Sequence, residues 1–301
     1  MLDDVIGQSQ AVTLLKQTVI SQKIAPAYLF AGIPGIGKGM AAKGFAELLL
    51  GCNFAESSWE SHPDLMWVEP TYNDKGSLIT ASQASAQNLH KKSAPQIRIE
   101  QIRQISQFLH RRPLKSDRLI VIIEDAHLMS EASANALLKT LEEPGNGTLI
   151  LLAPSIDSLL TTIVSRCQCV RFTSLSRQNL QLVLEKINHS EILNNPLLVA
   201  MAQGSPGLAI AGWQQLQTIP TDLYQQLLNI PQNYFEALMI AKTITQLELA
   251  TQLWLVDYLQ YYYWQQNQSF SLANQWEKTR QYLLSYVQPR LAWECLFITM
   301  V

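Results

Sequence analysis

Two patterns of apolar and polar residues alternate along the first half of the chain. Short runs of consecutive apolar residues, typical of strands buried on both faces of a sheet, are separated by stretches with apolar residues at helical spacing. This order predicts an α/β fold, in which a parallel sheet carries helices on both faces. The expected strands are Ala27–Ala31, Leu65–Val68, Leu119–Ile123 and Thr148–Ala153, and the expected helices are Met40–Leu50, Ile97–Leu109 and Ser130–Glu143.

The pattern changes twice. The segment 70–96 is polar and rich in Ser, Ala, Gln and Asn, so we expect a long surface loop or a partly disordered insertion there. After Phe172 the pattern is helical to the end of the chain. We therefore predict three domains: an α/β core at 1–172, a small helical domain at 173–212 and a C-terminal helical domain at 213–301.

The run Tyr258–Trp264 ends in four consecutive aromatic residues. We interpret it as a stripe that packs in a core and also forms an interface. Stacking on nucleic-acid bases is the alternative interpretation, and the scarcity of Lys and Arg among these aromatics disfavours it.

Composition and charge exclude several classes of protein. The chain has 301 residues, of which 48% are hydrophobic and 15% are charged, which excludes a disordered or collagen-like chain. With 22 basic and 24 acidic residues the formal net charge is −2, so a free-standing DNA-coating protein is excluded, although one face could touch DNA within an assembly. We expect no signal peptide, no membrane span and, from four cysteines without a CxxC pair, reduced thiols in a cytoplasmic protein.

A candidate phosphate-binding loop at 32–39 follows an expected strand and opens an expected helix. Its spacing is G-x-x-x-x-G-K, in which backbone N–H groups converge on phosphate oxygens and the helix N-terminus adds positive potential. Lys38 would reach the β and γ phosphates. The Ser or Thr that ligates Mg²⁺ is replaced by Gly39, so we expect the loop shape with impaired chemistry. The candidate loop residues are Gly32, Gly35, Gly37, Lys38 and Gly39.

An acidic pair, Glu124 and Asp125, follows the strand Leu119–Ile123. In a working nucleotide site the first acid holds Mg²⁺ and the second polarises the attacking water, and the usual order is Asp then Glu. The reversed order displaces both carboxylates by about one methylene, and a displacement of that scale slows catalysis. The alternative is that two acids merely end a strand.

Several motifs together resemble the bacterial clamp-loader AAA+ subunits over residues 3 to about 210. The resemblance implies an AAA+ core, a small helical lid domain and a C-terminal helical collar through which subunits oligomerise. It implies partners as well: tau/gamma and delta subunits, and through the complex a sliding clamp and primed DNA, with no membrane. The motifs are Asp4–Gln8, the loop 32–39, Ser133–Pro144, Ser165–Cys167 and Gln288–Ala292.

Departures from the family's ATPase pattern favour its stator subunit, whose own ATP site is often degenerate. Gly39 replaces the hydroxyl residue, Ala153 stands where the ATPase carries a polar residue that senses the γ-phosphate, and Gly207 stands where it carries an arginine. The resemblance then implies that ATP binds weakly or not at all, that a Mg²⁺ site is doubtful and that the chain does not hydrolyse ATP. A tau/gamma-type ATPase that tolerates Gly39 is the alternative, and a subunit that binds nucleotide without hydrolysis stays open.

Two further expectations come from the resemblance. The family usually carries a four-cysteine zinc module before a His-Pro-Asp segment, but only Cys52 precedes His62, so we predict no zinc. Arg166 in Ser165–Cys167 corresponds to the family's arginine finger, which reaches into a neighbour's ATP site. The alternative for Arg166 is a helix-end arginine paired with an acid.

A basic cluster could face a DNA backbone, although a solvated helix face is the usual interpretation of such a cluster. Its members are Arg98, Arg103, Arg111, Arg112, Lys115 and Arg118.

Overall fold

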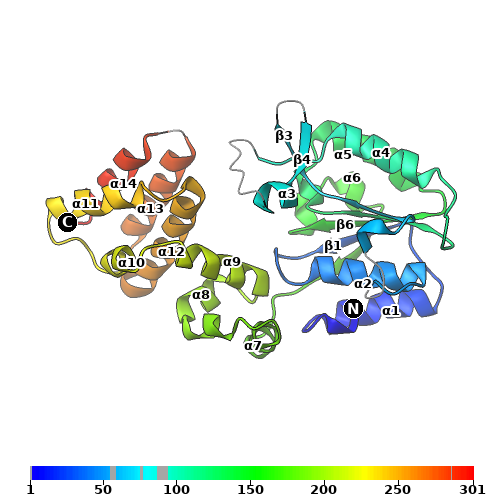
Figure 1. Cartoon of the computed structure of the whole chain (residues 1–301), viewed down its shortest axis with the longest axis horizontal. Helices are drawn as coiled ribbons and strands as arrows, with labels where there is room; N and C mark the ends of the chain where they lie inside the picture. Colours follow the sequence, from blue (N-terminus) through cyan, green and yellow to red (C-terminus); the bar gives the residue numbers. More distant parts are fainter. Residues whose placement is uncertain (1, 55–58, 75–76, 87–93, 286) are drawn as a thin grey trace. The chain divides into compact units, whose positions relative to one another are not determined.

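The computed structural model describes residues 2–54, 59–74, 77–86, 94–285 and 287–301 (Figure 1). The chain divides into two compact units, residues 1–183 and residues 184–301. The boundary between them falls within helix α7 (Arg177–Lys186). The division into three domains at 172/173 and 212/213 stays a prediction.

The first unit is built on a five-stranded parallel sheet with the order β2-β5-β6-β1-β7. Every residue of the three central strands is buried, which is the burial that their continuous apolar runs predict. The edge strand β7 has no continuous apolar run to mark it, because polar Gln168 and Arg171 stand at its two exposed ends. The strands are β1 (Ala27–Ala31), β2 (Leu65–Val68), β5 (Leu119–Ile123), β6 (Gly147–Ala153) and β7 (Gln168–Arg171).

Helices cover both faces of this sheet, as the alternating pattern predicts (Figure 1). On one face α1 (Ser9–Ile20) and α2 (Lys38–Leu50) enclose a core that contains Tyr28, Phe30 and Phe45. On the other face a second core contains Leu29, Ile105 and Leu137, and its helices are α4 (Ile99–Leu109), α5 (Glu131–Glu142) and α6 (Thr161–Val164). Short 3₁₀ helices lie at Leu2–Asp4, Trp59–Ser61, Ala126–Leu128 and Ile156–Ser158.

The expectation of a loop at 70–96 is wrong for the described part of that segment. Strands β3 (Thr71–Asp74) and β4 (Ser77–Thr80) form an antiparallel pair, and α3 (Ala81–Ala86) follows directly. Thr71 also exchanges two backbone hydrogen bonds with Gln96, at 2.9 and 3.0 Å. The polar composition hides this short hairpin, whose apolar residues are too few to mark strands. Residues 75–76 and 87–93 lie outside the described part.

The second unit is helical in its described part. Trp276 and Trp293 are fully buried at its centre, and the Tyr263 ring stacks on Trp276 with centroids 5.8 Å apart. Tyr258 is buried as well, so the aromatic run contributes to the core, as predicted, and the expected interface stays a prediction. After the 3₁₀ helix Ser190–Asn194, the helices are α8 (Pro196–Met201), α9 (Pro206–Gln217), α10 (Thr221–Leu227), α11 (Tyr234–Ile244), α12 (Leu249–Asn267), α13 (Phe270–Leu284) and α14 (Pro289–Ile298).

Candidate nucleotide site and arginine finger

The loop and the acidic pair lie at the same edge of the sheet. The loop joins β1 to α2, and Glu124 follows β5 directly. Because the strands are parallel, their carboxyl ends share one edge, where nucleotides bind in open α/β sheets. The carboxylates of Asp125 and Glu124 lie close enough to Lys38 for their charges to act on its ammonium. The structure thus brings together the loop and both acids.

Glycine is required at three positions of the loop. Gly35 and Gly37 have φ of 75° and 98°, in the region that disfavours every residue with a side chain. A Cβ at Gly32 would lie 2.5 Å from the carbonyl oxygen of Phe172, which is too close for any side chain. Gly37 precedes the first residue of α2, so the loop passes directly into the helix N-terminus. The conformation has the features of a phosphate-binding loop, and phosphate binding itself stays a prediction.

Lys38 points back over the start of the loop. Its ammonium donates hydrogen bonds to the carbonyl oxygen of Ile33, at 2.9 Å, and to that of Gly32. Burial lowers the pKa of Lys38, and the charges of Asp125 and Glu124 act in the opposite direction. The ammonium is therefore held at the loop, within reach of the charges of the acidic pair.

The two acids occupy different environments. Glu124 is largely buried and accepts a hydrogen bond from the indole N–H of Trp67 at 3.0 Å, and burial raises the pKa of Glu124. Asp125 has a left-handed backbone with φ of 46°, and its side chain is 52% exposed. The sequence pattern does not mark Trp67 as a site residue, because an aromatic residue in a strand usually indicates core packing.

Gln8 ties the start of the chain to the loop and to the end of the sheet. Its side-chain amide donates to the carbonyl of Thr173 at 2.8 Å and to that of Ile36 at 3.4 Å. Its carbonyl oxygen accepts from the backbone N–H of Thr173 at 3.1 Å. Gln8 is 3% exposed, and its hydrogen bonds attach the loop to the segment after the sheet. They give the motif Asp4–Gln8 a structural role.

Asp64, in the His-Pro-Asp segment, is fully buried and organises a turn about fifty residues away. Its carboxylate accepts hydrogen bonds from the backbone N–H groups of Leu114, Lys115 and Ser116 and from the Ser116 hydroxyl, at 2.7–2.9 Å. Burial alone would raise the pKa of Asp64, but these bonds outweigh it and lower that pKa to about 2. The segment therefore has a structural function that needs no metal, and the absence of zinc stays a prediction.

Arg166 lies away from the loop. It precedes β7, whose first residue pairs with Tyr28 near the amino end of β1, so Arg166 is at the opposite edge of the sheet. Its Nε and Nη2 donate to Oε1 of Glu142, at 3.1 and 2.6 Å, and its Nη1 donates to the carbonyl of Thr162 at 3.0 Å. This is the acid-paired geometry that the alternative interpretation describes, and the finger role stays a prediction.

The other predicted residues, Ala153, Gly207 and the basic cluster, lie on different elements of the structure. Ala153 ends β6 at the loop's edge of the sheet, and its carbonyl accepts from the backbone N–H of Gly32 at 3.1 Å. Gly207 lies in the first turn of α9, in the second unit. In the basic cluster Arg98 and Arg118 are half-buried, and Arg118 donates to the Thr148 hydroxyl at 3.2 Å. The exposed members are Arg103, Arg111, Arg112 and Lys115.

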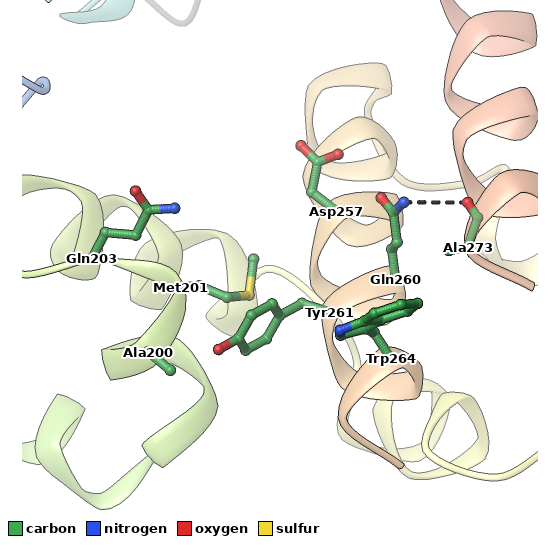
Figure 2. Close-up of a pocket in the computed structure, with 8 residues that line it drawn as sticks. All are labelled: Ala200, Met201, Gln203, Asp257, Gln260, Tyr261, Trp264 and Ala273. Atoms are coloured by element: carbon green, nitrogen blue, oxygen red, sulfur yellow. Dashed lines mark hydrogen bonds between the residues drawn. The ribbon is translucent and has the colours of Figure 1, made fainter. Parts of the chain in front are cut away.

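A separate cavity of about 320 Å³ lies within the second unit, between α8 and α12. Figure 2 shows Met201 and Tyr261 pointing toward each other across it. Gln260 donates to the carbonyl of Ala273 at 3.2 Å, and Asp257 pairs with Arg280 at 3.2 Å. Nothing in the sequence pattern marks this cavity, because its lining residues are dispersed over three helices and the turn after α8.

Two family models together match nearly the whole chain. The model described as DNA polymerase III, delta subunit, matches residues 7–176. The model described as Cyanobacterial DNA polymerase III delta prime, C-terminal domain, matches residues 178–300. Among the described residues, no helix combines the length and the apolar character that a bilayer crossing requires.

Curated relatives include subunits of two types. The chain is 38% identical over 123 residues to DNA polymerase III subunit delta' of Haemophilus influenzae. This alignment covers 40% of this chain and 37% of that protein. The chain is also 30% identical over 208 residues to DNA polymerase III subunit tau of Escherichia coli. That alignment covers 67% of this chain and 31% of that protein. The chain thus spans less than half the length of these relatives.

A solved structure has a similar fold. It is a DNA polymerase III, gamma subunit-related protein from Thermotoga maritima, with a TM-score of 0.56 over 95% of this chain and 98% of that one. The two sequences are 17% identical, so this likeness concerns the fold alone. It agrees with the AAA+ fold expected for the first unit.

Proposed function

Since the chain belongs to the clamp-loader family of DNA polymerase III subunits, matched by the delta-subunit model over residues 7–176, we propose that it is the stator subunit, delta-prime. In this proposal it has a degenerate ATP site of its own. It donates Arg166 to a neighbouring subunit's ATP site. It thereby helps the complex to load a sliding clamp onto primed DNA.

The position of Arg166 carries this proposal. The arginine and the loop 32–37 lie at opposite edges of the sheet, separated by the length of β1. A five-residue strand spans roughly 15 Å, which is more than an arginine side chain can bridge. Arg166 is therefore unsuited to its own loop and is exposed at the edge where a second subunit could approach.

Two missing polar groups and one engaged carboxylate in the same site support a subunit that does not hydrolyse ATP. Gly39 offers no hydroxyl, Ala153 has no polar group, and the Glu124 carboxylate accepts a hydrogen bond from Trp67. The match of residues 178–300 to a delta-prime C-terminal model supports the same choice of subunit. The partners in this proposal are tau/gamma and delta subunits, and a cytoplasmic location belongs to it.

The alternative is a tau/gamma-type ATPase, and two observations favour it. The loop keeps its glycine conformations with Lys38 beside the acids, and tau of Escherichia coli aligns over 67% of the chain. An ATPase assay on the isolated full chain, with Lys38→Ala as its control, separates the two proposals. We expect no hydrolysis above the level of Lys38→Ala. Turnover that Lys38→Ala abolishes would establish the ATPase instead.

The stator proposal itself is tested in the assembled clamp loader, with clamp and primed DNA present. Arg166→Ala should slow ATP hydrolysis by the complex, whereas the isolated chain contributes none of that activity. An undiminished rate would contradict the proposal.

A further inference from the structure

Four side chains are linked by direct contacts, and we call them the tryptophan cluster: Lys43, Trp59, Trp67 and Glu124. The two indole rings lie 5.0 Å apart, centroid to centroid. The Lys43 ammonium lies 4.0 Å from the Trp59 ring centroid and 5.0 Å from that of Trp67. Such cation–π geometry holds the lysine side chain against both rings, beside the candidate nucleotide site.

The strand register fixes Trp67 beside Glu124. Trp67 pairs with Ile122 across the parallel strands β2 and β5, so its side chain is on the face that Glu124, two residues further on, also uses. The backbone N–H of Glu124 donates to the carbonyl of Val68 at 2.8 Å, which holds the acid against β2. The indole N–H then reaches the Glu124 carboxylate at 3.0 Å. Rigid strands therefore set this contact.

The cluster also borders Gly39. A Cβ built at Gly39 would find Cη2 of Trp67 at 4.0 Å, an ordinary van der Waals contact, so crowding at the Cβ does not exclude a side chain. The indole edge nevertheless borders the position from which a hydroxyl would extend. The metal site of a phosphate-binding loop uses such a hydroxyl together with the first acid.

These residues do not fit a Mg²⁺ ion. Mg²⁺ requires near-ideal octahedral oxygen coordination. Here Gly39 supplies no side-chain oxygen, the indole N–H of Trp67 occupies one oxygen of the Glu124 carboxylate, and the positive charge of Lys43 acts on the same carboxylate.

We propose that Trp67 excludes Mg²⁺ from this site by holding Glu124, so that any nucleotide in the loop binds with the same affinity whether or not Mg²⁺ is present. Trp67 is a positioning residue in this account, because it acts through Glu124. The inference deepens the proposed degenerate ATP site, on which it rests.

The test measures binding of a slowly hydrolysed ATP analogue to the full chain by calorimetry, in excess Mg²⁺ and in EDTA. Four proteins are compared: wild type, Gly39→Thr, Trp67→Phe with Gly39→Thr, and Trp59→Phe with Gly39→Thr. The last is the matched control, because it alters the same aromatic pair and keeps the Trp67 N–H. Thermal unfolding of each variant checks that it is folded.

Only the Trp67→Phe, Gly39→Thr protein should bind the analogue more tightly in Mg²⁺, by about tenfold or more, which corresponds to about 1.4 kcal/mol. The other three should show equal affinity, or no binding, in both conditions. A Mg²⁺-dependent gain in wild type, in Gly39→Thr or in the Trp59→Phe control would overturn the proposal. So would equal affinity in both conditions for the Trp67→Phe double variant.

A second measurement needs no double variant. In a ¹⁵N spectrum of the wild-type chain with the analogue present, the Trp67 indole resonance, assigned by its loss in Trp67→Phe, should not move as Mg²⁺ is added. A saturable shift of that resonance would show that Mg²⁺ reaches Glu124 and would overturn the inference. Either failure leaves the stator proposal intact, because that proposal is tested through Arg166 in the assembled complex.

Discussion

Arg166 contacts one carboxylate oxygen of Glu142 through two of its N–H groups, at 2.6 and 3.1 Å. The pair lies at the edge of the sheet opposite the candidate phosphate-binding loop, and both side chains are partly exposed. An arginine that acts on a neighbour's phosphates would have to exchange this carboxylate for them. The pair thus holds the Arg166 guanidinium at the surface, where it is partly exposed.

Breaking this pair should hardly affect folding. Exposed ion pairs contribute about 0–1 kcal/mol, so Glu142→Gln and Arg166→Ala should each change the free energy of unfolding by less than about 1 kcal/mol. Urea unfolding of the isolated chain measures this. A loss well above that value would show that Arg166 has a structural role, which would weaken its use as a functional probe.

The Asp64 carboxylate should contribute strongly to the free energy of unfolding. Asp64→Asn keeps one acceptor oxygen and turns an NH₂ group toward backbone donors, so we expect a loss of about 2–4 kcal/mol in unfolding free energy. The matched control is Asp117→Asn, an exposed acid next to the same turn, which should change little. Equal effects of the two substitutions would contradict the role assigned to Asp64.

The same carboxylate predicts a pH dependence. The folded-state pKa of Asp64 is about 2, below its ordinary value, so its stabilisation is fully present above about pH 4 and is lost as the pH falls toward 2. The difference in unfolding free energy between wild type and Asp64→Asn should therefore shrink across that range. A difference that stays constant with pH would show that the charge of Asp64 is not what stabilises the turn.

Gly37 and Gly39 should respond in opposite directions to alanine. Gly37 has φ of 98°, so Gly37→Ala should cost about 1–3 kcal/mol in backbone strain. Gly39 lies in the first turn of α2 with room for a Cβ, so Gly39→Ala should stabilise the chain by about 0.5 kcal/mol. Thermal unfolding of both variants checks this, and destabilisation by Gly39→Ala would show that the site needs glycine for packing.

Gln8 should matter far more than its neighbour Gln10. Gln8→Ala removes three hydrogen bonds and leaves the carbonyl of buried Ile36 and two partly buried backbone groups of Thr173 without this partner, at a cost of about 1–3 kcal/mol. Gln10 is exposed, and Gln10→Ala should change the unfolding free energy by less than about 0.5 kcal/mol. Similar values for the two variants would contradict the bracing role of Gln8.

The sequence predicts the parts of the fold that periodicity encodes. Continuous apolar runs mark β1, β5 and β6 because both faces of those strands are covered, and Ser130 caps α5 as its position before the helix predicts. The hairpin within 70–96 and the strand β7 are missed because short edge elements bury too few residues to leave a pattern.

For the site, the motif predicts the loop and the acids, because backbone conformation and strand ends follow local sequence. The contacts of Trp67, Gln8 and Asp64 join residues up to 165 positions apart, so no local pattern reports them. Their roles depend on the register of β2 against β5 and on where the sheet ends.

The central claim is that Arg166 serves a neighbouring subunit's ATP site. It is tested most directly by single-turnover ATP hydrolysis in a reconstituted clamp loader with clamp and primed DNA, comparing wild type, Arg166→Ala, Arg166→Lys and Arg171→Ala. Arg171 is the matched control, an exposed arginine at the other end of β7. Hydrolysis at one site should slow by about 10³-fold or more in both Arg166 variants, because lysine cannot replace the forked guanidinium, and should be unchanged in Arg171→Ala. Wild-type rates at every site in Arg166→Ala would contradict the claim.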